Sequence, residues 1–229
     1  MNLEAHYDAM REAALCRLAQ GDADLDPLLD AADDRRGITL LARPPGHVIR
    51  EMEAVLADFR SAEPGQYYYP ASDIHLTILS IISCYRGFGL ELIDPAAYSA
   101  AVQDIVRHCR PFRIRFTGLT ASPGGIMVQG VPEDDTLNRL RDELRSFFRN
   151  AGLQQSIDQR YSIQTAHSTV LRFRRPLQNP ARLLEKIRQY QAHSFGTFEV
   201  DALELVFNDW YQRAGNTVLL ERYPLLNPG

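Results

Sequence analysis

The chain contains two successive series of predicted elements in the same order, and this internal repeat limits the folds that it can adopt. Each series runs strand, helix, strand, helix, strand. Three pairs of corresponding landmarks have similar spacing: Ile38 and Ile126 are 88 residues apart, Asp94 and Asn179 are 85 apart, and Phe112 and Phe198 are 86 apart. Two lobes built on one duplicated α+β design are therefore predicted.

Hydrophobic periodicity and turn residues give the bounds of these elements. The first series is a strand over 38–42, a helix over 47–60, a strand over 74–82, a helix over 95–108 and a strand over 112–119. The second is a strand over 126–131, a helix over 133–148, a strand over 161–173, a helix over 180–191 and a strand over 198–207. Pro123-Gly124-Gly125 and Gly215-Asn216 indicate hairpin turns, so we expect antiparallel pairing.

Residues 1–35 precede the repeat and are predicted to form a helical extension. Apolar residues recur there at steps of three and four. This spacing favours a helix that packs on the main domain over one that binds a partner. The remainder, 36–229, is predicted to be one domain of two lobes, about 36–120 and 121–229, which are free to exchange strands.

Composition restricts the class of protein and of partner. The 229 residues are 45% apolar and 24% charged, which excludes a disordered or collagen-like chain. The 25 basic and 29 acidic residues give a net charge of −4, so no extended surface for a nucleic-acid backbone is expected. A nucleic-acid substrate would be small, or only its end would be bound. Composition leaves the oligomeric state open, and a monomer is the simplest expectation.

Neither a disulfide framework nor a membrane segment is predicted. Cys16, Cys84 and Cys109 are widely spaced and form no C-x-x-C pair, which is typical of reduced, mostly buried thiols and argues against a structural zinc. No apolar run approaches eighteen residues, and the N-terminal residues are acidic where a signal peptide would be basic. We therefore expect a cytoplasmic protein without a membrane partner.

The residues with the clearest chemistry occupy equivalent places in the two halves. His75-Leu76-Thr77 lies in one predicted strand and His167-Ser168-Thr169 in its counterpart, so each half carries one H-x-T motif. Because strand side chains alternate between faces, the histidine and threonine of each motif point the same way. Such a motif is common by chance. Its recurrence at matching points of a repeat is what indicates a site.

Two imidazoles facing each other provide what cleavage of a phosphodiester requires. A neutral ring accepts a proton from the attacking oxygen, and a protonated ring donates one to the leaving oxygen. The neighbouring hydroxyls can bind the phosphate oxygens that do not react. A bell-shaped dependence of rate on pH follows from this pair of roles.

His75-Leu-Thr and His167-Ser-Thr-Val-Leu-Arg172 resemble the paired motifs of the two-histidine (2H) phosphoesterase superfamily. This superfamily includes the bacterial RNA 2′,3′-cyclic phosphodiesterases, or 2′-5′ RNA ligase-like proteins. The resemblance covers residues 37–222 and implies a bilobal, pseudo-twofold fold, in which antiparallel-rich sheets flank a central cleft and the helices lie outside. It also implies a metal-independent phosphoric diester hydrolase without cofactors, with a role in RNA processing, that cleaves cyclic or 2′-linked nucleotide phosphodiesters.

The resemblance assigns roles by position. His75 and His167 are the acid and base pair, and Thr77, Thr169 and Arg172 bind phosphate. We favour His167 as the base, but the near symmetry of the two motifs leaves this assignment open. Strict alternation from His167 would put Arg172 on the opposite face of the strand. Its role therefore requires a bulge or twist.

Further candidates for substrate binding lie near the motifs. Tyr69 ends the run Tyr67-Tyr68-Tyr69 before the first motif, where an aromatic ring could stack on a base. Arg174 follows the second motif, and Tyr211 lies near the last hairpin. Ordinary packing and solvation are the competing interpretations of these residues.

Two other classes of function fit the same residues. One is a nucleotide or RNA-end binding protein that keeps the cleft without turnover. The other is a metal-dependent hydrolase, because Asp73 and His75 have the spacing of two ligands on one strand face and His167 could supply a third. Loss of activity in a chelator would indicate the metal-dependent enzyme.

Overall fold

The computed structural model of the chain describes residues 2–159 and 162–226, whose strands form two antiparallel sheets. The first sheet has the order β3-β1-β8-β9 and contains β1 (Arg35–Ala42), β3 (Leu76–Arg86), β8 (Ala202–Asp209) and β9 (Val218–Pro224). The second has the order β2-β6-β5-β4-β7 and contains β2 (Tyr67–Tyr68), β4 (Phe112–Ser122), β5 (Gly125–Pro132), β6 (Ser168–Arg172) and β7 (Ser194–Val200). Both sheets draw strands from both halves of the chain.

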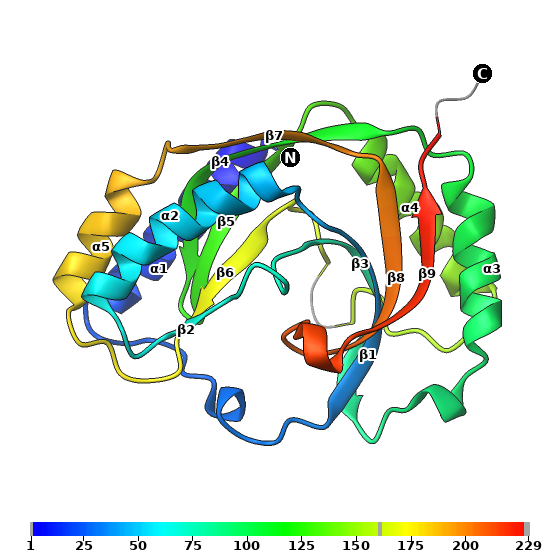
Figure 1. Cartoon of the computed structure of the whole chain (residues 1–229), viewed down its shortest axis with the longest axis horizontal. Coiled ribbons are helices and arrows are strands. Elements are labelled where there is room, and N and C mark those ends of the chain that lie inside the picture. Colours follow the sequence, from blue (N-terminus) through cyan, green and yellow to red (C-terminus); the bar gives the residue numbers. More distant parts are fainter. Residues whose placement is uncertain (1, 160–161, 227–229) are drawn as a thin grey trace.

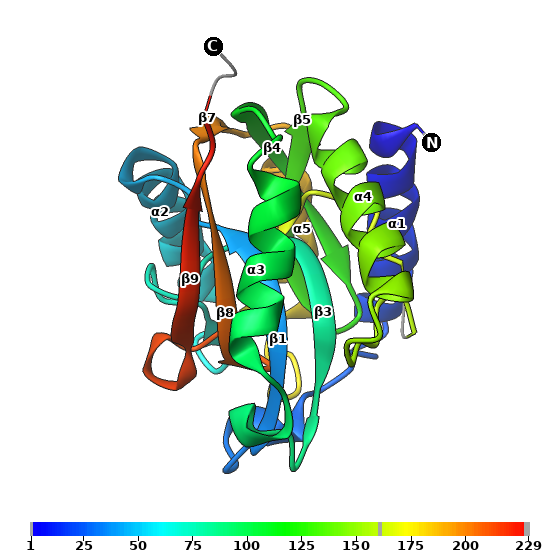
Figure 2. The same cartoon turned by 90° about the vertical axis from the view of Figure 1, so that its right-hand side faces the viewer.

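Helices cover the outer faces of the two sheets, which face each other across the middle of the molecule (Figure 1). The second sheet is covered by α1 (Leu3–Leu18), α2 (Gly46–Ala62) and α5 (Pro180–Gln189). The first is covered by α3 (Pro95–Val106), which contacts β9, and α4 (Thr136–Asn150), which contacts β3. Figure 2 shows α3 in front of this sheet, with β8 and β9 on one side of it and β3 on the other. The predicted α+β fold of two related lobes is confirmed.

The two sheets have matching orders, because β3-β1-β8-β9 corresponds to β6-β5-β4-β7. The strands that follow the two histidines, β3 and β6, therefore occupy equivalent places. Local sequence signals set several boundaries as expected. Asp94 caps α3 by accepting a hydrogen bond from the Ala96 N–H at 3.0 Å, and Pro95 is the first helical residue.

The strand predicted over 161–173 is shorter in the structure, and residue 161 lies outside the described residues. Only β6 pairs with neighbouring strands. The backbone before it bonds to side chains, because the Thr165 carbonyl accepts from Arg141 and the Ala166 N–H donates to Tyr7. These side-chain bonds satisfy the backbone carbonyl and N–H groups, which in a β-strand would bond to a neighbouring strand.

The strand predicted over 198–207 consists of two strands in different sheets. The chain leaves the second sheet at the end of β7 and enters the first sheet with β8. The alternation of buried and less buried residues is interrupted at Asp201 and Ala202, two consecutive residues that are not buried. This change of phase falls where the chain passes from one sheet to the other, and the single predicted strand overlooked it.

In the described part of the chain, no helix is long and apolar enough to cross a membrane. The three cysteines, all of which lie among the described residues, form no disulfide. Cys16 is exposed on α1, which differs from the expectation that all three would be largely buried.

Candidate active site

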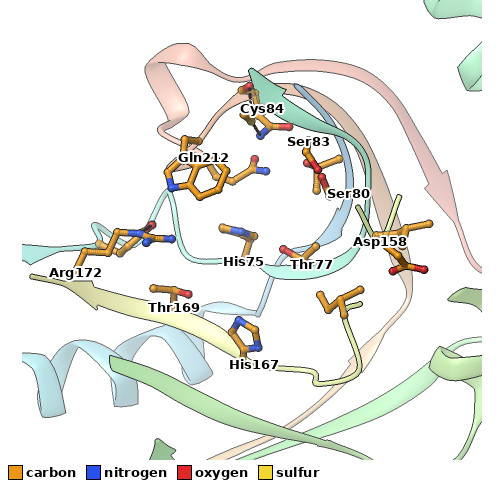
Figure 3. A pocket seen from close by; sticks show the side chains of 16 residues that line it. His75, Thr77, Ser80, Ser83, Cys84, Asp158, His167, Thr169, Arg172 and Gln212 are labelled. Atoms are coloured by element: carbon orange, nitrogen blue, oxygen red, sulfur yellow. Dashed lines mark hydrogen bonds between the residues drawn. The ribbon is translucent and has the colours of Figure 1, made fainter. Parts of the chain in front are cut away.

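The two histidines lie immediately before corresponding strands, one on each sheet. His75 precedes β3 and His167 precedes β6, and both side chains are half-buried in the wall of one pocket. Figure 3 shows the two rings on facing segments, with Thr77 and Thr169 beside them. The structure thus brings together the four residues of the two motifs.

Side-chain bonds connect the two motifs directly. The Ser168 hydroxyl donates to the carbonyl oxygen of His75 at 2.8 Å. Arg141, which α4 inserts between the motifs, donates from Nη2 to the carbonyls of Thr77 and Thr165, both at 2.9 Å. These bonds fix the backbone on either side of the pocket, so the two imidazoles are held in one relative arrangement.

His75 carries its fixed proton on Nδ1. This nitrogen lies 2.7 Å from the carbonyl oxygen of Asp73, and a carbonyl only accepts. Nε2 is therefore the atom that can exchange a proton with a ligand. Burial lowers the pKa of His75 to about 4, and the Asp73 bond partly opposes this by favouring the charged ring.

His167 is held differently. Its Nδ1 lies 2.7 Å from the Thr165 hydroxyl, which can accept or donate. Burial, followed by the positive charges of Arg141 and Arg172, lowers the pKa of His167 to about 4. The causes that act on this pKa all lower it, so His167 is the ring better suited to remain neutral.

A bulge in β6 places Arg172 in the pocket. In the pairing of β5 with β6, Met127 is opposite Thr169 and Ile126 is opposite Leu171, so Val170 is the extra residue. Val170 and Leu171 are both buried, which returns Arg172 to the face of Thr169. The bulge required for Arg172 to reach the site is present.

The three further substrate-binding candidates have different places. Tyr69 is buried in the pocket wall, and its hydroxyl accepts a hydrogen bond from Arg172 Nε at 2.8 Å. Tyr211 is fully buried behind the wall, under the Arg213 guanidinium. Arg174 bonds to the Gly65 carbonyl and pairs with Asp30. The structure therefore groups Tyr69 with the site, whereas Arg174 and Tyr211 do not line the pocket.

Sequence reasoning missed a row of hydroxyl groups on β3. Successive irregularities in the pairing of β1 with β3 give β3 a period of three, so Thr77, Ser80 and Ser83 all face the pocket. A hydroxyl residue at every third position within an apolar strand was the available signal. The sequence also contained a signal for Arg141, because this charged residue interrupts the buried apolar stripe of α4.

The residues that suggested a metal site are not arranged as ligands. The Asp73 carboxylate accepts bonds from the Ala214 N–H at 3.0 Å and the Ser72 hydroxyl at 2.8 Å. Asp73 faces His75 with its carbonyl instead. Over residues 2–159 and 162–226, no cluster of three histidine, cysteine or acidic side chains could hold a metal ion.

Comparison with known proteins identifies the family. The sequence model of the 2′-5′ RNA ligase superfamily matches residues 44–210, so the chain belongs to this family of 2H phosphoesterases. The predicted resemblance is confirmed, and by class the chain is a phosphoryl-transfer enzyme. No curated protein is similar enough in sequence to match the chain.

Solved structures share the fold at low sequence identity. TT0787 of Thermus thermophilus is 20% identical, with a TM-score of 0.57 over 82% of this chain and 97% of its own. E. coli LigT complexed with 3′-AMP is 14% identical, with a TM-score of 0.55 over 84% and 99%. LigT in its apo form is 16% identical, with a TM-score of 0.56 over the same shares. These likenesses establish the architecture.

Proposed function

We propose that the chain is a metal-independent phosphodiesterase that hydrolyses 2′,3′-cyclic or 2′-linked phosphodiesters of nucleotides or RNA ends. One observation carries the proposal: two imidazoles with free Nε2 atoms face one pocket, each beside a threonine hydroxyl, and Arg172 lies on the same wall. The crystallised complex of LigT with 3′-AMP supports a small nucleotide as the ligand.

The surroundings of the two rings favour one assignment of the two proton transfers. Nε2 of His167 takes a proton from water as the water oxygen forms a bond to phosphorus. The bond from phosphorus to the ribose oxygen breaks, and Nε2–H of His75 donates its proton to that oxygen. His75 suits the acid role because the Asp73 carbonyl stabilises its charged ring, and His167 suits the base role because Arg141 disfavours its charged ring. Arg172 and the two threonines bind the phosphate oxygens that stay.

Hydrolysis of the four nucleoside 2′,3′-cyclic monophosphates in EDTA tests the proposal. We expect turnover by the wild type and a loss of several orders of magnitude in both His75→Ala and His167→Ala. His47→Ala is the matched control, because His47 is a histidine on α2 outside the pocket wall. The isomer of the product identifies the leaving oxygen. Tight nucleotide binding without turnover would instead indicate a binding protein, and activity lost only in EDTA would indicate a metal-dependent enzyme.

A further inference from the structure

The pocket continues beyond the histidines to a second polar region that the proposed chemistry does not use. Figure 3 shows Gln212, Ser80 and Ser83 on the far side of His75 from His167. Asn208, at the end of β8, lines the same part of the pocket, as does Thr39 on β1. This region is made by the first sheet and by the turn that follows β8.

Two side-chain carbonyl oxygens in this region are buried without a partner. Asn208 is 2% exposed and Gln212 is 5% exposed, yet Asn208 Oδ1 and Gln212 Oε1 accept no hydrogen bond within the described part of the chain. An unpaired buried acceptor is unfavourable and is uncommon in folded proteins. Within the described residues, both oxygens therefore keep an unused capacity to accept a hydrogen bond.

The orientation of the Asn208 amide is set by its surroundings. Its Nδ2 donates to the Asp209 carbonyl at 2.8 Å and to Cys84 Sγ at 3.5 Å. Rotating the amide would place Oδ1 against the carbonyl oxygen, and two acceptors repel each other. Asn208 consequently presents an acceptor, and not a donor, at its unpaired position.

The turn that carries Gln212 is held in an unusual conformation. Gln212 has φ of 58°, a region that non-glycine residues seldom adopt. The fully buried Asp209 carboxylate maintains the turn by accepting from the N–H groups of Tyr211 and Arg213, both at 3.0 Å. A backbone in such a conformation persists only where surrounding bonds hold it, and residues of this kind are frequent at ligand sites.

We infer that Asn208 and Gln212 form a base-recognition subsite that selects nucleobases with an exocyclic amino group over their oxo analogues. This inference rests on the proposed function, which places the phosphate between the histidines. An amino group brings N–H donors to the fixed acceptor of Asn208 and to the side chain of Gln212, whereas an oxo group brings only lone pairs.

Matched nucleotide pairs test the subsite. Cytosine and uracil differ at one amino or oxo position, as do adenine and hypoxanthine. We expect 3′-CMP to bind more tightly than 3′-UMP, and 3′-AMP more tightly than 3′-IMP, by roughly tenfold to hundredfold in calorimetric titrations. The kcat/KM values for the corresponding 2′,3′-cyclic nucleotides should follow the same order.

Variants identify the residues responsible. In Asn208→Leu and Gln212→Met the ratio of cytosine to uracil affinity should fall towards one, and in Gln103→Met, an exposed position on α3, it should stay at the wild-type value. A ratio measured on one preparation does not depend on how much of that preparation is folded, so a destabilised variant remains informative.

The possible results separate the two proposals. Turnover of all four cyclic nucleotides with equal affinities for amino and oxo bases would overturn the subsite and leave the phosphodiesterase intact. Base selectivity without turnover would support the subsite and overturn the phosphodiesterase. A selectivity that persists in both variants would also overturn the subsite.

Discussion

Arg141 is a buried cation placed between the two histidine motifs. It is 1% exposed, and burial lowers its pKa to about 10. It has no ion pair with a carboxylate within residues 2–159 and 162–226, and it donates to the carbonyls of Thr77, Ile78 and Thr165. Because no carboxylate among the described residues pairs with it, the positive charge of Arg141 acts on the ionisable groups of the pocket. We regard Arg141 as a positioning residue that also disfavours a proton on His167.

Replacing Arg141 separates these two effects. Arg141→Met leaves three carbonyls without their donor, so we expect the free energy of unfolding to fall by about 2–4 kcal/mol. The loss of a nearby positive charge should also raise the pKa of His167 above about 4. Arg141→Lys keeps the charge and loses the planar fork, so it should destabilise the protein while leaving the pKa low. NMR titration of His167 checks the shift, and an unchanged pKa in Arg141→Met would contradict this role.

At the residue scale, the sequence singled out the residues that we propose to act on phosphate better than those that support them. His75, His167 and their threonines stood out because a repeat placed the same motif twice. Arg172 required a bulge that alternation could not reveal. Asn208 and Gln212 gave no signal, because their role depends on which of their hydrogen bonds remain unmade in three dimensions.

At the element scale, helix α1 supports the second motif although the family match begins only at residue 44. Tyr7, on its buried face, accepts a hydrogen bond from the Ala166 N–H at 3.2 Å and donates to the Gly130 carbonyl at 3.1 Å. Ala166 directly precedes His167. The extension is therefore joined to the backbone that positions one of the two imidazoles, and burial raises the pKa of the Tyr7 hydroxyl to about 12.

Removing the Tyr7 hydroxyl tests this support. In Tyr7→Phe the segment before His167 loses its acceptor, so we expect kcat to fall roughly tenfold or more while KM changes little, because the phosphate contacts remain. Tyr98→Phe is the matched control, since Tyr98 is equally buried and its hydroxyl also bonds to a backbone carbonyl, that of Gln154 at 2.6 Å. Equal losses of activity in both variants would show that Tyr7 contributes to stability alone.

Elements were predictable where local chemistry decides them. The Asp94-Pro95 start of α3 and the hairpin at Pro123-Gly124-Gly125 follow from capping and turn residues. Strand limits failed before β6, where distant side chains replaced the ladder, because periodicity does not encode long-range pairing. They also failed between β7 and β8, where the change of phase at Asp201 and Ala202 was the available signal.

At the scale of the whole molecule, the pocket couples protonation to folding. The pKa of both imidazoles is near 4 in the folded chain and near 6.5 in an unfolded one. The unfolded chain therefore binds more protons in this window, and these two groups lower the free energy of unfolding as the pH falls from about 6.5 towards 4. An anion between the rings raises both pKa values, so the bound form takes up protons that the free form does not hold.

This coupling predicts how an anion stabilises the protein. Sulfate keeps its charge between pH 5 and 7.5, so a change in its effect over that range reports on the protein. We expect sulfate to raise the melting temperature, relative to chloride at equal ionic strength, more at pH 5 than at pH 7.5, because its binding becomes tighter as the imidazoles gain protons. In the double variant His75→Ala, His167→Ala only the general stabilising effect of sulfate should remain, and that effect needs no imidazole. A wild-type response that is the same at both pH values would show that anions do not bind between the two histidines.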